Sequence, residues 1–352
     1  MERKKILSLS LALGISGVAL FFALRDVSLP HLGHVLWKGH YGWLLPATIL
    51  LLVIYGLRAF FWRQTLSVTR VVPLFHLYSS VVVGYMANNI LPFRGGEMVR
   101  ALYTRKIEHL PLPVLLSTIF IERLFDLVSL SLVLFLFLTT AGQPVGSKSL
   151  WLIGGTFALF LGLYALVRGR GKILGFLDRS LLPLVQGHRL AVRILKLLEQ
   201  VLHGFSSLTS PLLLLRLFLT SLLIWSLTLV FTWLCLLMFD ITAHPVEMTL
   251  AFLVFTNLAL LIPSSPGGIG VIQLAAVYAL APYHVPADRA IALSLVGQAL
   301  SIALTGVLGY YFITRSHLSL AQMRHQAMEI TEGRVRAEEA IPGPAENPGG
   351  KQ

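Results

Sequence analysis

Two stretches of the sequence place proline and paired glycines inside otherwise apolar segments, and chemistry is expected at these breaks. The first reads Asn-Asn-Ile-Leu-Pro-Phe-Arg-Gly-Gly-Glu over residues 88–97, and the second reads Pro-Ser-Ser-Pro-Gly-Gly-Ile-Gly over residues 263–270. A bilayer tolerates non-helical backbone only where protein buries it or where it lines a wet cavity. Paired breaks, one in each half of a transporter, mark the place where the transported molecule binds. The pair therefore predicts a carrier rather than an anchor or a scaffold.

The first break offers an anion site. The chain restarts after it as a short helix, whose N-terminal N–H groups and partial positive charge favour a phosphate or carboxylate. Arg94 and Arg100 can add bidentate phosphate contacts that lysine does not match. In the structural alternative, Glu97 caps the helix and the arginines only fix the topology. The candidate headgroup-binding residues of this break are Asn88, Asn89, Pro92, Arg94, Gly95, Gly96, Glu97 and Arg100.

The second break has the composition of a half-helix whose N-terminus points at an anionic ligand. Proline is favoured at helix starts, and glycine lets backbone approach closely. Two serines add hydroxyl groups. The alternative is a kinked helix that packs through small residues. The candidate ligand-binding residues here are Ser264, Ser265, Pro266, Gly267, Gly268 and Gln273.

Glu122, Arg123 and Asp126 form a charged cluster within an apolar segment. At 1.5 Å per residue, Glu122 lies about 15 Å from the start of that segment, near the bilayer middle. Glu122 and Asp126 share a helix face, and Arg123 can reach Asp126 three residues on. Intramembrane ionisable groups each cost at least about 2.5 kcal/mol, so they usually pair and mark a pathway. Two interpretations stay open: a pathway, or a neutralised structural cluster tied to Arg94 or Arg100.

The composition indicates that these residues are positioned by membrane-spanning helices. Of 352 residues, 56% are hydrophobic and 12% are charged, and the mean hydropathy is +0.77. Soluble domains carry about 25% charged residues. Uncharged stretches long enough to cross a bilayer occupy residues 6–24, 127–147, 149–167, 217–239, 248–287 and 290–314. We therefore expect an all-α, polytopic integral membrane protein.

The net charge of +12 lies mainly in loops between apolar segments. This is the pattern set by membrane insertion, with attraction to anionic lipid headgroups, and it does not indicate nucleic-acid binding. The single cysteine, Cys235, excludes an intramolecular disulfide and a thiol metal site. No nucleotide-binding loop, nucleophile elbow or zinc-protease motif occurs. We expect no cofactor and no metal.

The distribution of lysine and arginine predicts the topology, because cytoplasmic loops hold the excess. About six full spans are expected, with both termini in the cytoplasm, at residues 6–24, 42–62, 112–139, 149–168, 212–239 and 289–314. If 73–92 dips in and returns, only Arg25, Lys38, Lys148 and Arg289 lie outside. Arg123 then lies within the membrane and the other basic residues are cytoplasmic. Segment 73–92 is too short to cross twice, so it is predicted to be re-entrant.

The second break behaves similarly. Residues 246–262 and 267–281 are short, uncharged and separated by the break, so they form either a re-entrant pair or two short spans with a tight turn. This unit must start and finish outside, whereas the first dips from the cytoplasm. Opposite insertion of two broken elements is typical of an inverted-topology repeat.

The domain organisation follows from these spans. Residues 1–315 form a transmembrane domain, and its first helix is retained rather than cleaved as a signal peptide. Residues 169–210 form a cytoplasmic amphipathic segment or a plain loop. Residues 316–352 form a cytoplasmic tail with a disordered end.

Three ordered motifs resemble the transmembrane region of the lysylphosphatidylglycerol synthase family, a flippase-like membrane family, over about residues 5–315. The matching residues are Asn89-x-x-Pro92-x-Arg94-x-Gly96-Glu97-x-x-Arg100, then Glu122-Arg123-x-x-Asp126, then Pro263-x-Ser265-Pro266-Gly267-Gly268-Ile269-Gly270-Val271. One departure is Gln273, where the family often has glutamate.

The resemblance implies a lipid transporter of the bacterial inner membrane, moving an anionic phospholipid or an isoprenoid-type lipid. Its headgroup would pass between the two broken elements. Aminoacyl transfer is not implied, because no soluble domain for it follows, so we expect no enzyme. The expected partners are membrane lipids, with a second copy of the chain or lipid-biosynthesis enzymes as further candidates. The alternatives are a membrane-embedded transferase using Glu122 or Asp126 as general base, and an accessory subunit of a lipid or glycan assembly complex.

Overall fold

The computed structural model describes residues 2–25, 27–91, 95–140, 154–158, 161–162, 164–165, 168–169, 210–262 and 264–316. Every regular element within these ranges is a helix, which confirms the predicted all-α class. The elements are α1 (Glu2–Leu24), α2 (Leu29–Trp37), η1 (Tyr41–Trp43), α3 (Leu44–Leu66), α4 (Leu74–Ile90), α5 (Gly96–Glu108), α6 (Leu112–Thr140), α11 (Pro211–Leu237), α12 (Pro245–Ala259), η5 (Pro266–Gly268), α13 (Val271–Leu280), η6 (Ala281–Tyr283) and α14 (Ala287–Arg315).

Four helical segments in the described part of the chain are long and apolar enough to span a membrane. They are Tyr41–Leu66, Pro211–Leu237, Pro266–Tyr283 and Ala287–Arg315. The bent pair Leu13–Leu24 and Leu29–Trp37, which meet at 83°, makes a fifth if it is one span. Polytopic membrane character is therefore confirmed, but the predicted count of six full spans is not. Helix α6 has the length, at 29 residues, but charged side chains interrupt its first half.

Helices α4 and α5 form a hairpin that begins and ends on the same side of the molecule. Arg70, before α4, donates from Nη1 to the carbonyl of Glu108, the last residue of α5, at 3.0 Å, and His76 of α4 contacts the Glu108 carboxylate. The arms pack closely because glycines face each other: a Cβ on Gly96 would lie 2.1 Å from the carbonyl oxygen of Gly84. At 17 residues, α4 is about 26 Å long, short of the roughly 30 Å hydrocarbon core. The chain thus dips in and returns.

Helices α12 and α13 form a second hairpin around the other break. The ring of His244, just before α12, lies 6.2 Å from that of Tyr283 in η6, so the start and the end of this hairpin lie close together. The tip contains three glycines with positive φ, at 73°, 74° and 93° for Gly267, Gly268 and Gly270. Those backbone angles suit only glycine well, and they explain why the break is glycine-rich.

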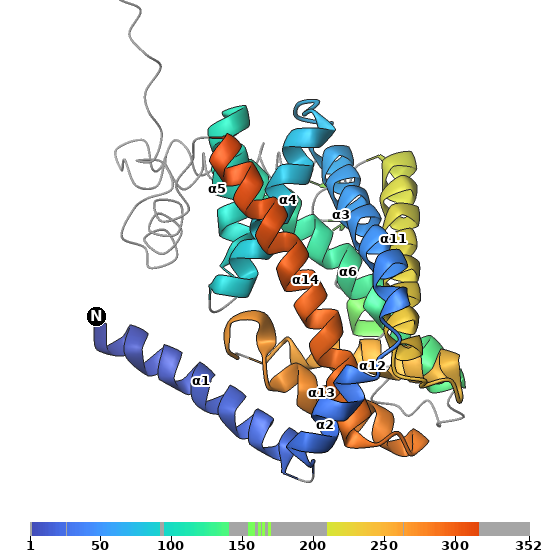
Figure 1. Cartoon of the computed structure of the whole chain (residues 1–352). Coiled ribbons are helices and arrows are strands. Elements are labelled where there is room, and N and C mark those ends of the chain that lie inside the picture. The colour runs from blue at the N-terminus through green and yellow to red at the C-terminus, as the bar shows by residue number, and fades with distance from the viewer. Residues whose placement is uncertain are drawn as a thin grey trace, which may run out of the picture.

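The two hairpins open at opposite ends of the molecule. The start of α3 lies at the base of the second hairpin, since His40 donates from its backbone to the Met238 carbonyl at 2.8 Å and pairs with Asp240 at 3.2 Å. The far end of α3 lies at the base of the first, beside Arg70. Figure 1 shows α14 running alongside both hairpins, from its lower end near α13 to its upper end near α5. This is the arrangement that an inverted-topology repeat produces.

The hairpin tips meet inside the bundle, where η5 packs against α4. Asn89, near the end of α4, donates from Nδ2 to the Thr305 hydroxyl of α14 at 3.1 Å. A Cβ on Gly267 would lie 3.9 Å from the Asn89 Oδ1 atom. The structure therefore brings together two breaks that are about 170 residues apart in the sequence.

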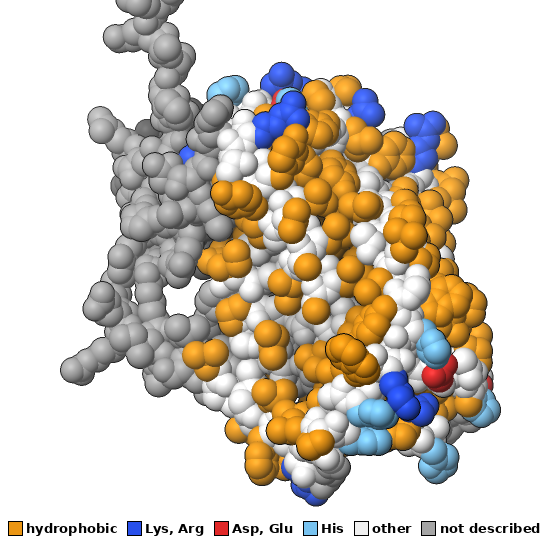
Figure 2. Space-filling view, in the orientation of Figure 1, with side chains coloured by type: hydrophobic (Ala, Val, Ile, Leu, Met, Phe, Trp, Pro, Cys, Tyr) orange, Lys and Arg blue, Asp and Glu red, His pale blue; other side chains and the backbone are white. Residues whose placement is uncertain are grey.

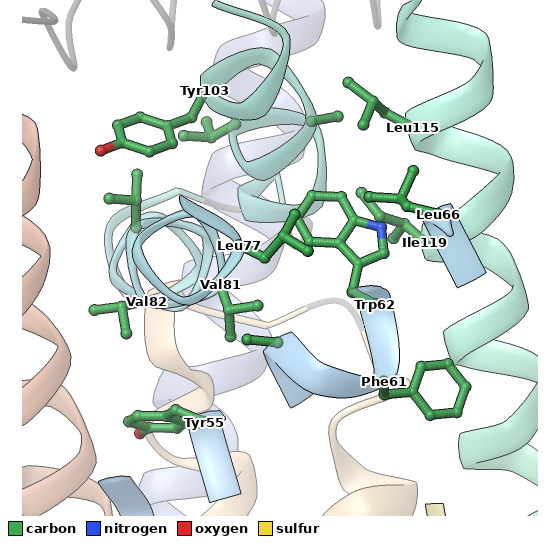
Figure 3. Close-up of a cluster of buried hydrophobic side chains, with 14 of the residues drawn as sticks. Tyr55, Phe61, Trp62, Leu66, Leu77, Val81, Val82, Tyr103, Leu115 and Ile119 are labelled. Atoms are coloured by element: carbon green, nitrogen blue, oxygen red, sulfur yellow. The ribbon is translucent and has the colours of Figure 1, made fainter. Parts of the chain in front are cut away.

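The largest fully buried side chain is Trp62 of α3, and it anchors the core of the first half. Figure 3 shows it between Leu77 and Val81 of α4 and Ile119 of α6. Its indole N–H donates to the Thr118 hydroxyl at 3.0 Å, so burial leaves no polar atom unpaired. This core fixes α3 against both α4 and α6.

The surface carries the polarity of a membrane protein. On the face in Figure 2, charged and histidine side chains gather at the upper and lower edges, with a mainly hydrophobic and uncharged band between them. Several large apolar side chains of the candidate membrane spans are exposed, including Val53, Leu219 and Val307. An exposed apolar belt of this kind suits a lipid environment.

Several predictions fall on parts of the chain outside the described residues. These are the roles of Pro92, Arg94 and Pro263, most of the span at 149–168, the amphipathic segment 169–210 apart from its first and last residues, and the tail beyond residue 316.

Candidate functional site

Six charged side chains from three helices form one network inside the bundle. Helix α3 supplies Arg58, α5 supplies Glu97 and Arg100, and α6 supplies Glu122, Arg123 and Asp126. The hairpin packing places α5 against α6, and the Trp62 core places α3 against both. The network thus lies where the first broken element meets an intramembrane helix.

Glu122 is the centre of this network. Its side chain is 2% exposed. One carboxylate oxygen, Oε1, accepts from Arg58 Nη1 at 2.9 Å and from Arg123 Nη2 at 3.1 Å, and the other, Oε2, accepts from Arg100 Nη1 at 2.8 Å. Charge-assisted bonds of this length are the strong ones. Three cations therefore hold one buried carboxylate.

Asp126 lies one helical turn further along α6. Arg58 Nη1 and Arg123 Nη1 lie 3.1 Å and 3.0 Å from its Oδ2 atom. The Trp225 indole of α11 donates to its Oδ1 atom at 3.0 Å. The predicted pairing of Arg123 with Asp126 is confirmed, and the tie to α11 joins a fourth helix to the site.

Arg100 is buried, and only part of its hydrogen-bonding capacity is used. Its guanidinium carbon lies 3.9 Å from the centroid of the Trp62 ring, a cation–π contact. Its Nη1 atom bonds Glu122, while its Nε and Nη2 atoms are buried without a hydrogen-bond partner. The helix can come this close because Gly84 faces it: a Cβ there would lie 2.9 Å from the Arg100 Cβ atom. A buried guanidinium with unused donors is suited to an anion.

The network is electrically balanced among the described residues, with three arginines against three carboxylates. Balance matters because an unpaired charge at membrane depth is costly. The interpretation of a neutralised cluster tied to Arg100 is therefore supported by the structure. It does not remove the pathway interpretation, since Arg100 Nε and Nη2 remain buried donors without a partner.

Other residues of the first break have structural partners. Asn88 Oδ1 accepts from the Gly96 backbone N–H at 2.9 Å, so one of the amides predicted to bind a ligand is already paired. Gly95 is the N-cap residue of α5, and it has no side chain with which to cap that helix. Glu97 points instead to Arg123, which argues against the alternative in which it serves as a cap.

The second break is held mainly by bonds to its own and neighbouring elements. Gln273 is fully buried; its Oε1 atom accepts from the Gly270 N–H at 2.6 Å and its Nε2 atom donates to Gln298 at 2.9 Å. Gln298 donates in turn to the Gly267 carbonyl. A Cβ on Gly270 would lie 2.3 Å from the Ser16 carbonyl oxygen of α1. The amide of Gln273 thus maintains the loop.

The remaining residues of the second break are likewise turned to the protein. The Ser265 N–H donates to the Ser16 hydroxyl at 2.7 Å, and its own hydroxyl donates to the Ile269 carbonyl at 2.9 Å. Pro266 begins η5, whose Gly268 is buried, and Ser264 is half-buried. No described hydrogen bond or ion pair joins this break to the six-charge network, so the structure shows two adjacent regions rather than one ring of ligands.

Arg58 is the functional residue that the sequence reasoning missed. The topology prediction counted it as cytoplasmic, whereas it lies eight residues before the end of α3, bonded to Glu122 and Asp126. Arg58 was therefore not singled out as a site residue from the sequence. A signal was present, because Arg58 is a charged residue within the apolar segment 42–62, and such residues are functional candidates by default. Trp225 and Gln298 carried no comparable signal.

The histidines and carboxylates do not gather into a metal centre. Within the described part of the chain, no group of three or more His, Cys, Asp or Glu side chains could hold a metal ion. His31 pairs with Asp288 at 3.0 Å, and His244 with Glu247 at 3.1 Å, each as an isolated pair.

Fold and site together define a multi-pass helical membrane protein with two inserted hairpins and an internal charge network. The family model described as the lysylphosphatidylglycerol synthase TM region matches residues 9–309, so the chain belongs to that family. Comparison with curated proteins gives no match. Family membership makes it a membrane protein of lipid metabolism or transport, and confirms the resemblance seen in the motifs.

Proposed function

We propose that this protein moves an anionic lipid, a phospholipid or an isoprenoid-type lipid, between the leaflets of a bacterial inner membrane, with both termini in the cytoplasm. The observation that carries the proposal is the network around Glu122, where buried arginines lie at the meeting of a broken element and an intramembrane helix. Ionisable side chains are energetically costly inside a membrane and occur there mainly along substrate or ion pathways. The headgroup would exchange with the carboxylates on these arginines.

The hairpin geometry supports the same proposal. Two elements inserted from opposite ends, with their tips in contact, are the framework of carriers that expose one central site alternately to each side. A lipid carrier needs only a polar path for the headgroup, since the acyl chains stay in the bilayer.

The transferase alternative is weaker. It needs Glu122 or Asp126 as a general base with an oxygen free for the substrate proton. Glu122 accepts from three arginines, and Asp126 is bound by two arginines and Trp225. We therefore propose that the protein is not an enzyme and uses no cofactor.

A comparison of lipid composition with lipid sidedness tests the function. In cells lacking the gene, a transporter's loss changes the leaflet distribution of one anionic lipid while total amounts stay constant. Loss of an enzyme instead removes a chemical species. Complementation with Arg100→Gln should fail, while Arg216→Gln, a change at an exposed arginine of α11, should restore the wild-type distribution. Unchanged sidedness in the deletion strain would contradict the proposal.

A further inference from the structure

One edge of the charge network reaches the outer face of α6. Phe120, Arg123 and Leu127 lie three and four residues apart, so they share a helix face. Phe120 is 49% exposed and Leu127 is 42% exposed, while the Arg123 side chain is 34% exposed. The opposite side of this helix is buried, with Glu122 turned inward. A cation therefore lies on the outward face of an apolar helix, between two large apolar side chains.

The only partner that Arg123 has on α5, among the described residues, is Glu97. Its carboxylate Oε1 lies 3.2 Å from Arg123 Nε, and the Glu97 side chain is 29% exposed. The pair is poorly formed: Arg123 Nε and Glu97 Oε2 are both buried without a hydrogen bond. Arg123 Nη1 and Nη2, by contrast, are well bonded to Asp126 and Glu122. Among the described residues, Glu97 is thus the carboxylate of the network that pairs with an arginine without a hydrogen bond.

We propose that Glu97 occupies the place of a lipid phosphate. An anionic phospholipid docks from the side of the bundle, its phosphate displaces Glu97 from Arg123, and its acyl chains lie along Phe120 and Leu127. This inference rests on the proposed function and identifies where the cargo first binds. The charges match: the phosphate replaces one negative group with another, so the buried part of the network stays neutral while the lipid is bound.

The same geometry gives Glu97 a role in release. A carboxylate that stays tethered beside Arg123 competes with every bound phosphate and keeps the lipid from being trapped. A carrier needs binding that is strong enough to capture its cargo and weak enough to release it. The neighbouring Arg100, with unused donors on the same helix as Glu97, offers the next position for the phosphate further inside.

Lipid retention in nanodiscs tests the proposal. The full chain is reconstituted in mixed phosphatidylglycerol and phosphatidylcholine discs, extracted in mild detergent, and its bound lipids are quantified. Wild type should retain phosphatidylglycerol preferentially, and Arg123→Gln should lose the preference. Glu97→Gln should raise phosphatidylglycerol retention by up to about fivefold, because a partly exposed competing ion pair is removed. Arg216→Gln is the matched control and should behave as wild type.

The direction in which Glu97→Gln changes phosphatidylglycerol retention distinguishes a competing carboxylate from a structural one. If Glu97 only maintained the structure, its replacement would lower retention. A fall in retention like that of Arg123→Gln, or no phosphatidylglycerol preference in wild type, overturns the docking site. A thermal melt of each variant in detergent separates a lost site from a lost fold. The proposed function can fail while the docking site stands. That outcome would be tighter lipid binding by the Glu97→Gln protein together with no transfer of lipid between leaflets by wild type.

Discussion

Replacing Glu122 with glutamine tests whether the six charges act as one unit. The substitution keeps the shape of a side chain that is 2% exposed but removes the charge that three arginines share. It leaves three arginines against two carboxylates inside the bundle. Removing one partner from a buried ion pair costs about 3–5 kcal/mol, because a buried charge is left uncompensated. We expect the free energy of unfolding to fall by that amount.

The assay is reversible unfolding in mixed micelles by titration with dodecyl sulfate. The charge-balancing double variant, Glu122→Gln with Arg100→Gln, removes one charge of each sign. Its loss of stability should be smaller than the summed losses of the two single variants by about 0.5–3 kcal/mol, the range found for residues in one network. A Glu122→Gln protein within about 0.5 kcal/mol of wild type, or strictly additive effects, would refute the reasoning.

Three further predictions concern the packing that holds the network and the second break. Gly96→Ala should abolish lipid retention and lower the melting temperature, because its Cβ would lie 2.1 Å from the Gly84 carbonyl oxygen. The control is Gly56→Ala, which has open space around it and should melt at or above the wild-type temperature. Trp62→Ala should lower the free energy of unfolding by about 3–5 kcal/mol, measured in the same micelle titration, because it leaves a cavity at a fully buried site. Gln273→Leu should cost about 1–3 kcal/mol in that assay, since the Gly270 N–H is left unpaired, while Gln273→Glu keeps the acceptor and should cost less.

The sequence predicted the two breaks well, for a physical reason. Proline and paired glycines disrupt a helix wherever they occur, so the end of α4 at Ile90 and the end of α12 at Ala259 could be predicted from local sequence. Their opposite insertion also followed from the positions of basic residues. The contact between the tips was foreseen only in general terms, because it depends on how α4 and η5 pack.

Only part of the charge network could be predicted from the sequence. Glu122, Arg123 and Asp126 are neighbours on one helix, so their pairing follows from helix geometry. Arg58 is 64 residues away from Glu122, and counting basic residues for topology assigned it to the cytoplasmic side. Gln273 was expected to touch a ligand, whereas the structure shows it bonded to the Gly270 N–H and to Gln298. Partners across helices depend on tertiary packing, which no local pattern of one sequence contains.

The central claim is that the protein carries an anionic lipid across the membrane, and transfer between the leaflets of a reconstituted vesicle measures this directly. Fluorescent phosphatidylglycerol or phosphatidylcholine is placed in both leaflets, and the outer population is quenched with an impermeant reductant. With wild type, all of the phosphatidylglycerol should be quenched, and faster than in protein-free vesicles. Quenching of phosphatidylcholine should be much slower. Arg123→Gln should abolish this difference between the two lipids. Transfer no faster than in protein-free vesicles, or equal for the two lipids, would contradict the central claim.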